Sequence, residues 1–215
     1  MHFDEKMYLR HALLLIGLLL TGFASAEADK RSKIERESSS VKTYHANHSQ
    51  GHQIDVKVHN DGERVLIHVS FLVPVLPQQA WAVLTDFNNL SDFMPGIQSS
   101  KVSNKMGNTM HVSQRGVTQF GLFSYSIDTV EEVNLTPFSK IHHRMISGNM
   151  QKMEETTMLV QEGDLTRITH SADIVPGFWI LRFVGQSFIE NEARQRFIQT
   201  RKEIIRRNSL ESSPN

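Results

Sequence analysis

The clearest pattern in the chain is an alternation of apolar and polar positions between Glu63 and Val75. One face of this segment is apolar throughout, with Val65, Ile67, Val69, Phe71 and Val73. Leu66 and Leu72 are the exceptions on the other face. Period-two spacing in a β-branched segment predicts a strand with one face on a core. Pro74 and Pro77 end it, because proline donates no hydrogen bond to a strand ladder.

The next segment predicts two short helices. Proline suits the first turn of a helix, and Pro77 is followed by apolar residues at helical spacing: Ala80, Trp81, Leu84 and Phe87. A second short helix is expected from Asn89 to Phe93, where Pro95-Gly96 stops it.

Residues 97–174 predict an antiparallel meander of about six strands. Turn signals interrupt the segment repeatedly, at Gly107-Asn108, Gly116, Gly121, Thr136-Pro137, Gly148-Asn149 and Gly163-Asp164. Short apolar alternations lie between them, as in Ile168, His170, Ala172 and Ile174. Strands joined by such short turns pair with their sequence neighbours.

After Pro176-Gly177, the stretch from Phe178 to Arg207 predicts one long helix, with Gly185 as its weak point. A curved antiparallel sheet must have its apolar face covered, and this helix is the one element long enough to cover it. The expected fold is therefore α+β: a curved antiparallel sheet around a long C-terminal helix, with two short helices after the first strand.

The N-terminal region predicts export. A short apolar run from Ala12 to Leu20 follows Lys6 and Arg10, and Ala24-Ser25-Ala26 supplies the small residues of a cleavage site. The run spans only about 14 Å as a helix, too short for a bilayer. We expect a signal peptide cleaved after Ala26, with translation starting at Met1 or Met7. An uncleaved anchor or a buried helix is the alternative.

The boundaries follow from composition. Residues 27–50 are polar and predict a flexible leader; residues 51–207 form the domain and residues 208–215 a disordered tail. His45, His48 and His52 cluster near the leader in a pattern that can bind Zn²⁺, Cu²⁺ or Ni²⁺. No rigid element holds them, so we interpret them as a solvated linker and expect no metal.

Charge and composition exclude several classes of function. The chain has 23 basic and 23 acidic residues, which gives no argument for nucleic acid. It has no cysteine, so thiolate metal sites and Cys nucleophiles are absent. The sequence contains no G-x-S-x-G, H-E-x-x-H or P-loop motif. No cofactor is expected.

Several local motifs resemble a known superfamily. They are Pro77-x-x-Ala80-Trp81-x-Val83-Leu84-Thr85-Asp86-Phe87, Phe93-Met94-Pro95-Gly96-Ile97, Ser147-Gly148, Thr166-Arg167-Ile168-Thr169-His170, and Pro176-Gly177-Phe178. They resemble the START-like (SRPBCC) superfamily of polyketide cyclase/dehydrase and lipid-transport proteins. This resemblance implies a helix-grip fold with an internal pocket but transfers no reaction. Family members often carry Trp where this chain has Thr157, which changes the expected lining.

The cavity is the candidate site. Met110, Tyr125, His143 and Thr157 are its expected lining on the sheet, although a hydrogen-bonded core histidine is the favoured explanation of His143. On the long helix a polar gap formed by Ser187, Asn191 and Arg194 interrupts the apolar stripe. Arg194 is then predicted to meet a ligand carboxylate, phosphate or carbonyl. The alternatives are that the helix bends or rolls so that these residues reach solvent, or that Arg194 pairs with a sheet carboxylate such as Glu155.

Three acidic residues near these motifs have ordinary explanations. Glu154 and Glu155 are strand neighbours that face opposite sides, so they cannot act as a carboxylate pair. Asp86 is expected to cap or end the first helix.

These expectations favour an exported binder or carrier of an apolar molecule such as a lipid, isoprenoid or polyketide-like aromatic, in the periplasm of a Gram-negative bacterium. One alternative is a cyclase or aromatase-like enzyme that uses Arg194, His143 and Tyr125. Another is an interaction domain with a collapsed cavity. The basic helix end allows transient membrane contact, through Arg201, Lys202, Arg206 and Arg207.

Overall fold

The computed structural model describes residues 53–120, 123–177 and 185–211. The predicted signal peptide, the leader and residues 178–184 of the expected helix lie outside these ranges. The elements are β1 (Asp55–Asn60), β2 (Val65–Val73), α2 (Pro77–Leu84), the short 3-10 helix η1 (Phe87–Asn89), α3 (Leu90–Phe93), β3 (Ile97–Met106), β4 (Thr109–Phe120), β5 (Phe123–Thr136), β6 (Lys140–Gly148), β7 (Lys152–Glu162), β8 (Leu165–Val175) and α4 (Gln186–Glu211).

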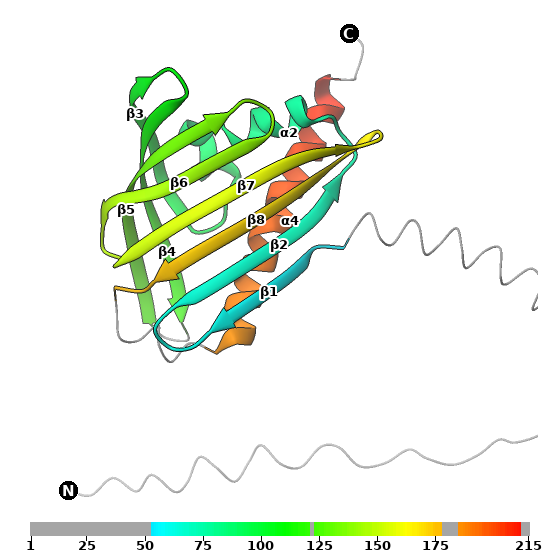
Figure 1. Cartoon of the computed structure of the whole chain (residues 1–215). Helices are drawn as coiled ribbons and strands as arrows, with labels where there is room; N and C mark the ends of the chain where they lie inside the picture. The colour runs from blue at the N-terminus through cyan, green and yellow to red at the C-terminus, as the bar shows by residue number, and fades with distance from the viewer. Residues whose placement is uncertain (1–52, 121–122, 178–184, 212–215) are drawn as a thin grey trace, which may run out of the picture. The chain divides into compact units, whose positions relative to one another are not determined.

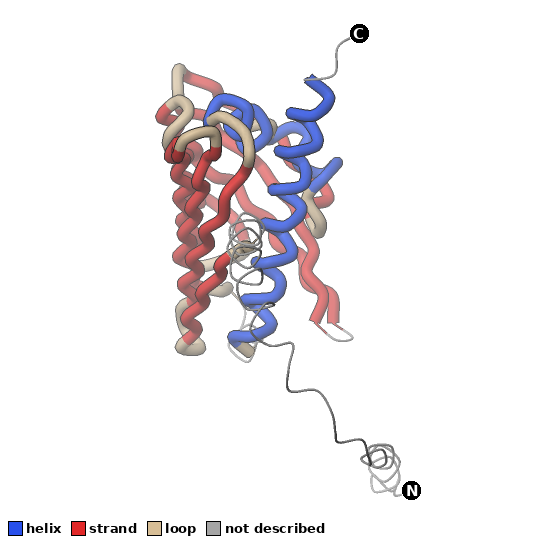
Figure 2. The backbone as a smooth tube through the Cα atoms, turned by 90° about the vertical axis from the view of Figure 1, so that its right-hand side faces the viewer, coloured by secondary structure: helices blue, strands red, loops and turns tan. Residues whose placement is uncertain are grey.

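The strands form one antiparallel sheet of eight strands in the order β1-β2-β8-β7-β6-β5-β4-β3. Helix α4 crosses its inner face (Figure 1). Strands lie on both sides of α4 in Figure 2, so the sheet wraps around the helix. The predicted α+β class, the six-stranded meander and the long terminal helix are confirmed.

Strand β1 adds one element to the predicted order, so the two short helices follow the second strand. Its signal is a short alternation of Ile54, Val56 and Val58, which are all buried. This segment was expected inside the domain, but no strand was predicted there. In β2 the expected apolar face is buried, with Phe71 at 1% exposure, while Leu66 is 38% exposed on the other face.

The short helices begin and end where the sequence indicated. Pro77 opens α2, and the side chain of Gln79 accepts a hydrogen bond of 2.9 Å from the backbone N–H of Leu76. Ala80 and Val83 are buried on its inner side. Phe87 and Leu90 carry the buried face of η1 and α3.

The apolar core consists of two clusters. The larger joins β1, β2 and α4 through residues such as Val69, Phe71 and Ile204. The smaller joins η1, α3 and strands β4 to β6 through residues such as Phe87, Val112 and Val133. Trp81, Leu84 and Phe93 border both clusters. The candidate site lies between them.

The sheet has two outer strands, β1 and β3, each paired on one side only within the described part of the chain. Strand β3 is mostly exposed, and its pairing with β4 shifts register twice. Strand β1 turns Asp55, Lys57 and His59 outward.

The C-terminal end of α4 is held by an ion-pair cluster. Glu203, 10% exposed, accepts hydrogen bonds of 2.7 Å from both Arg206 and Arg207. Arg207 also pairs with Asp86 at 2.6 Å, so Asp86 anchors α4. The C-cap of α2 is Thr85, and Asp86 stands at the start of η1 without a side-chain capping bond. The helix continues past Arg207 to Glu211, so residues 208–211 extend it instead of beginning a tail. Among the described residues, no helix is long and apolar enough to cross a membrane.

Glu203→Gln is expected to lower the free energy of unfolding at pH 7 by about 2 kcal/mol, the scale of a charged hydrogen bond. Hydrogen bonds from Arg206, and then from Arg207, lower the pKa of Glu203 more than burial raises it, and they hold this pKa at about 2. A lowered pKa stabilises the fold above the unfolded value of 4.5, and this stabilisation is lost as pH falls toward 2. Urea unfolding at pH 7 and pH 3 should therefore show a smaller difference between variant and wild type at pH 3. An equal difference at both pH values would contradict this account.

Candidate functional site

A cavity of about 620 Å³ lies between the inner face of the sheet, the short helices and α4. This volume falls within the usual range for sites that bind small molecules. Its walls are mainly apolar, formed by side chains such as Ile67, Val83, Leu84, Phe87, Leu90, Phe93, Met94, Ile97, Val117, Ile127, Ala172, Ile174, Ile189, Ala193 and Phe197.

A row of polar side chains crosses the inner face of five strands, from β4 to β8. We call this row the polar belt; its members are Gln114, Glu131, His143, Glu155, Thr157 and His170. Strand register places them together, because His143 lies opposite Glu155 and Thr157 lies opposite His170. All of them line the cavity except Glu131, which lies behind His143.

Glu131 and His143 form a buried pair. The Nδ1 atom of His143 lies 2.8 Å from Oε2 of Glu131. The side chain of His143 is 14% exposed and that of Glu131 is 3% exposed. The hydroxyl of Thr129 donates a 2.8 Å hydrogen bond to the other carboxylate oxygen. Burial opposes charge on the imidazole, but the hydrogen bond and charge of Glu131, with the charge of Glu155, outweigh it and raise the pKa of His143. His143 is therefore both the predicted lining residue and the predicted hydrogen-bonded histidine.

His170 has the opposite electrostatic character. Burial is the main cause that lowers its pKa, and the charges of His143 and Arg196 act in the same direction. Its Nδ1 atom lies 3.0 Å from the hydroxyl of Thr157, and its ring lies against Phe197 with centroids 4.9 Å apart. His170 is thus neutral at pH 7.

Two charged side chains at the cavity are unpaired among the described residues. The side chain of Glu155, half-buried on β7, makes no hydrogen bond or ion pair with any of them, and neither does that of Arg196 on α4. Arg196 and Glu192 are exposed and lie at the side of the cavity that α4 forms. The sheet side of the cavity thus carries the carboxylate of Glu155 and two imidazoles, and the side formed by α4 carries one acidic and one basic side chain near solvent.

The structure brings together two of the residues predicted for the sheet side of the site. His143 and Thr157 line the cavity. Met110 is buried in the smaller core cluster instead. Tyr125 shares a strand face with the lining residue Ile127 but is not part of the lining itself.

The polar gap predicted on the long helix lies away from the cavity. Ser187 and Asn191 are exposed, and Arg194 pairs with Glu190 at 2.9 Å and donates to the backbone carbonyl of Ile54. The partner suggested for Arg194, Glu155, is not its partner. The reason is the rotation of α4, whose cavity side carries Ile189, Ala193, Arg196, Phe197 and Thr200.

Glu131, His170 and Arg196 were not among the site residues predicted from the sequence, and Glu155 was predicted only as a possible partner of Arg194. The sequence predicted that Glu154 and Glu155 face opposite sides of their strand, and the structure assigns the sides: Glu154 lies outward near Lys152 and His142, while Glu155 lines the cavity. The remaining signal was the period-two spacing of His170 with Ile168, Ala172 and Ile174.

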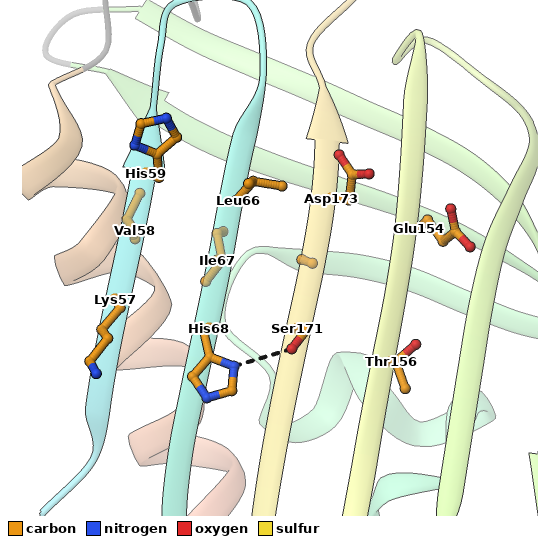
Figure 3. A pocket seen from close by; sticks show the side chains of 11 residues that line it. Lys57, Val58, His59, Leu66, Ile67, His68, Glu154, Thr156, Ser171 and Asp173 are labelled. Carbon is orange, nitrogen blue, oxygen red and sulfur yellow. Dashed lines mark hydrogen bonds between the residues drawn. The ribbon is translucent and has the colours of Figure 1, made fainter.

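A second hollow, of about 500 Å³, lies mainly on the outer face of β1, β2, β8 and β7. Figure 3 shows its side chains spread over neighbouring strands, with His68 and Ser171 joined by a 3.2 Å hydrogen bond. Both of its acidic residues already have basic partners. Hydrogen bonds from Arg64 and Lys152 hold the pKa of Asp173 at about 2, and Glu154 pairs with Lys152 at 3.5 Å. We therefore place the candidate site in the inner cavity.

Metal binding has no support in the described part of the chain, which contains no cluster of three or more metal-ligating side chains. His45, His48 and His52 lie outside it.

Comparison with known families gives a match over residues 73–199, to a family described as polyketide cyclase / dehydrase and lipid transport. The chain belongs to this family. No curated protein sequence matches the chain.

Solved structures show the same fold as this member of the polyketide cyclase / dehydrase and lipid transport family. A STAR-related lipid transfer protein fragment from Xanthomonas axonopodis aligns with a TM-score of 0.60 and 13% identity, over 70% of this chain and 93% of that one. A protein from Thermus thermophilus aligns with a TM-score of 0.58 and 15% identity, over 69% of this chain and 99% of that one. A START superfamily protein from Mycobacterium smegmatis aligns with a TM-score of 0.54 and 14% identity, over 68% of this chain and 99% of that one. At these identities the similarity concerns the fold.

Proposed function

We propose that the protein binds an apolar small molecule, such as a lipid, isoprenoid or polyketide-like aromatic, and carries it without catalysis. The observation that carries this proposal is the cavity of about 620 Å³, whose walls are mainly apolar. Burial of hydrocarbon in such a space is favourable by roughly 25 cal/mol for each Å² removed from water. The family description, which includes lipid transport, is consistent with it.

We further propose that the carrier works outside the cytoplasm, in the periplasm or as a secreted protein. The support is the apolar run from Ala12 to Leu20 and the small residues before the proposed cleavage after Ala26. An aqueous compartment between membranes is where an apolar molecule needs a carrier.

Transient membrane contact is a weaker part of the proposal. The basic helix end that suggested it is largely engaged within the protein: Arg206 and Arg207 pair with Glu203, and Arg201 donates to the carbonyl of Leu72. Lys202 is exposed.

A second candidate function is an enzyme of the cyclase or aromatase type. The observation that favours it is the Glu131–His143 pair with its 2.8 Å contact, beside the unpaired Glu155. A protonated imidazole in a cavity can act as a general acid. An interaction domain with a collapsed cavity fits less well, because the cavity is open.

Ala193→Trp tests the proposed function. Ala193 lies on the cavity side of α4, so the indole would fill space that a ligand needs. We expect binding of the neutral dye Nile red, followed by fluorescence titration, to weaken by about tenfold or more, which corresponds to about 1.4 kcal/mol.

Ala82→Trp is the matched control, because Ala82 is exposed on α2 and is not part of the cavity lining. It should bind the dye as the wild type does. Wild-type protein that binds no apolar probe, or equal binding by the Ala193 variant, would overturn the proposal.

A further inference from the structure

We infer that the cavity selects an uncharged apolar ligand that carries a hydroxyl group, an alcohol or phenol, over a carboxylate with the same hydrocarbon. This inference rests on the proposed function and names the ligand class of that same cavity. It follows from the charges and the hydrogen-bonding atoms of the polar belt.

The charges of the inner cavity disfavour an anion. Glu131 and His143 offset each other across their 2.8 Å contact, and neutral His170 adds no positive charge. Glu155 remains as a carboxylate without a partner among the described residues. A ligand carboxylate beside it would place two like charges together, away from bulk water, where they are weakly screened.

The hydrogen-bonding atoms suit a hydroxyl. His143 and Glu155 are direct cross-strand partners, a relation that brings two Cβ atoms to about 5 Å. Because Nδ1 of His143 is engaged by Glu131, its Nε2 is the atom left for a ligand. Nε2 is a donor when the imidazole is protonated, which is the form that the neighbouring Glu131 favours. A hydroxyl between the two residues can accept from His143 and donate to Glu155. A carboxylate can accept but has no proton to donate.

Arg196 supports the competing possibility, an acid whose head group stays at the edge of the cavity. It is cationic, exposed and unpaired among the described residues, so it could hold a carboxylate near solvent. Glu192 lies one helical turn away on the same side of α4 and offsets this charge. The experiment must therefore separate Glu155 from Arg196.

The test uses the full chain loaded with Nile red and compares displacement by 1-decanol and by decanoate at pH 7.5. The preference is the ratio of the two displacement constants within each protein, so a change in dye affinity cancels. We expect wild type to prefer decanol by about tenfold or more. Glu155→Gln should reduce this preference severalfold, because decanoate no longer meets a like charge.

Glu154→Gln is the matched control. It removes the same charge one residue away, on the outer face of the sheet, and should leave the preference unchanged. Displacement of the dye by decanoate as well as or better than by decanol would overturn the inference while leaving the proposed function intact. Loss of the displacement by decanoate in Arg196→Gln would then identify Arg196 as the residue that holds the carboxylate. An equal effect of both Glu variants would also overturn it. If neither decanol, decanoate nor the dye binds, the proposed function itself is refuted.

Discussion

Replacing Gly177 with alanine is expected to lower the free energy of unfolding by about 3 kcal/mol, the upper range for a forced steric overlap. An added Cβ would fall far inside contact distance of the carbonyl oxygen of Asn149, and only 2.9 Å from the carbonyl carbon. Neither partner can move freely, because the backbone N–H of Gln151 is bonded to the carbonyl of Val175 at 3.0 Å. Urea unfolding at pH 7 measures the loss.

Gly185→Ala is the control for this experiment, since a Cβ there would meet no atom within 4 Å. It should change stability by less than about 1 kcal/mol. Comparable losses in the two variants would show that glycine flexibility, and not the close approach to Asn149, is what matters. The same contact shows that the Gly148-Asn149 turn and the Pro176-Gly177 segment lie against each other.

Glu131→Leu is the second substitution with a large expected effect, about 3 kcal/mol at pH 6. It leaves His143 buried without its carboxylate and Thr129 without its acceptor. Urea unfolding should show the loss, and the double variant Glu131→Leu/His143→Leu should recover part of it. The neighbouring Glu132→Leu removes a more exposed pair with Arg144 and should cost less than about 1 kcal/mol. Equal losses at positions 131 and 132 would contradict this account.

The loss of stability in Glu131→Leu should depend on pH in a defined direction. The pKa of His143 is raised in the folded protein, so its contribution to stability is fully present below the unfolded value of 6.5. That contribution disappears as pH rises through the higher folded pKa. The difference between wild type and Glu131→Leu should therefore be larger at pH 5.5 than at pH 9. A difference that grows with pH would refute the charged state assigned to His143.

The fold was predictable because its signals are local. The alternation in β2 follows from burial of one sheet face, and Pro77 marks the helix start whatever surrounds it. Strand β1 was missed because its alternation, from Ile54 to Val58, is short and adjoins a polar leader. Pairing with β2 and contact with α4 stabilise it, and both are tertiary interactions that a local pattern does not contain.

The site was less predictable because it depends on register and rotation. His143 was predicted from strand alternation, because it shares a face with Ile141 and Met145, and Thr157 was predicted from the family resemblance. Glu131 could not be predicted as a site residue, because only the pairing of β5 with β6 brings it to His143. On α4 the predicted face was rotated, because Arg194 bonds to the Ile54 carbonyl and the smaller Ala193 faces the cavity. A helical pattern with several polar residues does not determine such a rotation.

The two outer strands have a consequence for the protein in concentrated solution. An open sheet edge is a template on which further chains can add, and the risk rises when the edge is long, flat and apolar. Strand β3 is interrupted by two register shifts and carries Lys101 and Lys105, while β1 turns charged and polar side chains outward. These features oppose edge-to-edge aggregation at both outer strands of the described sheet.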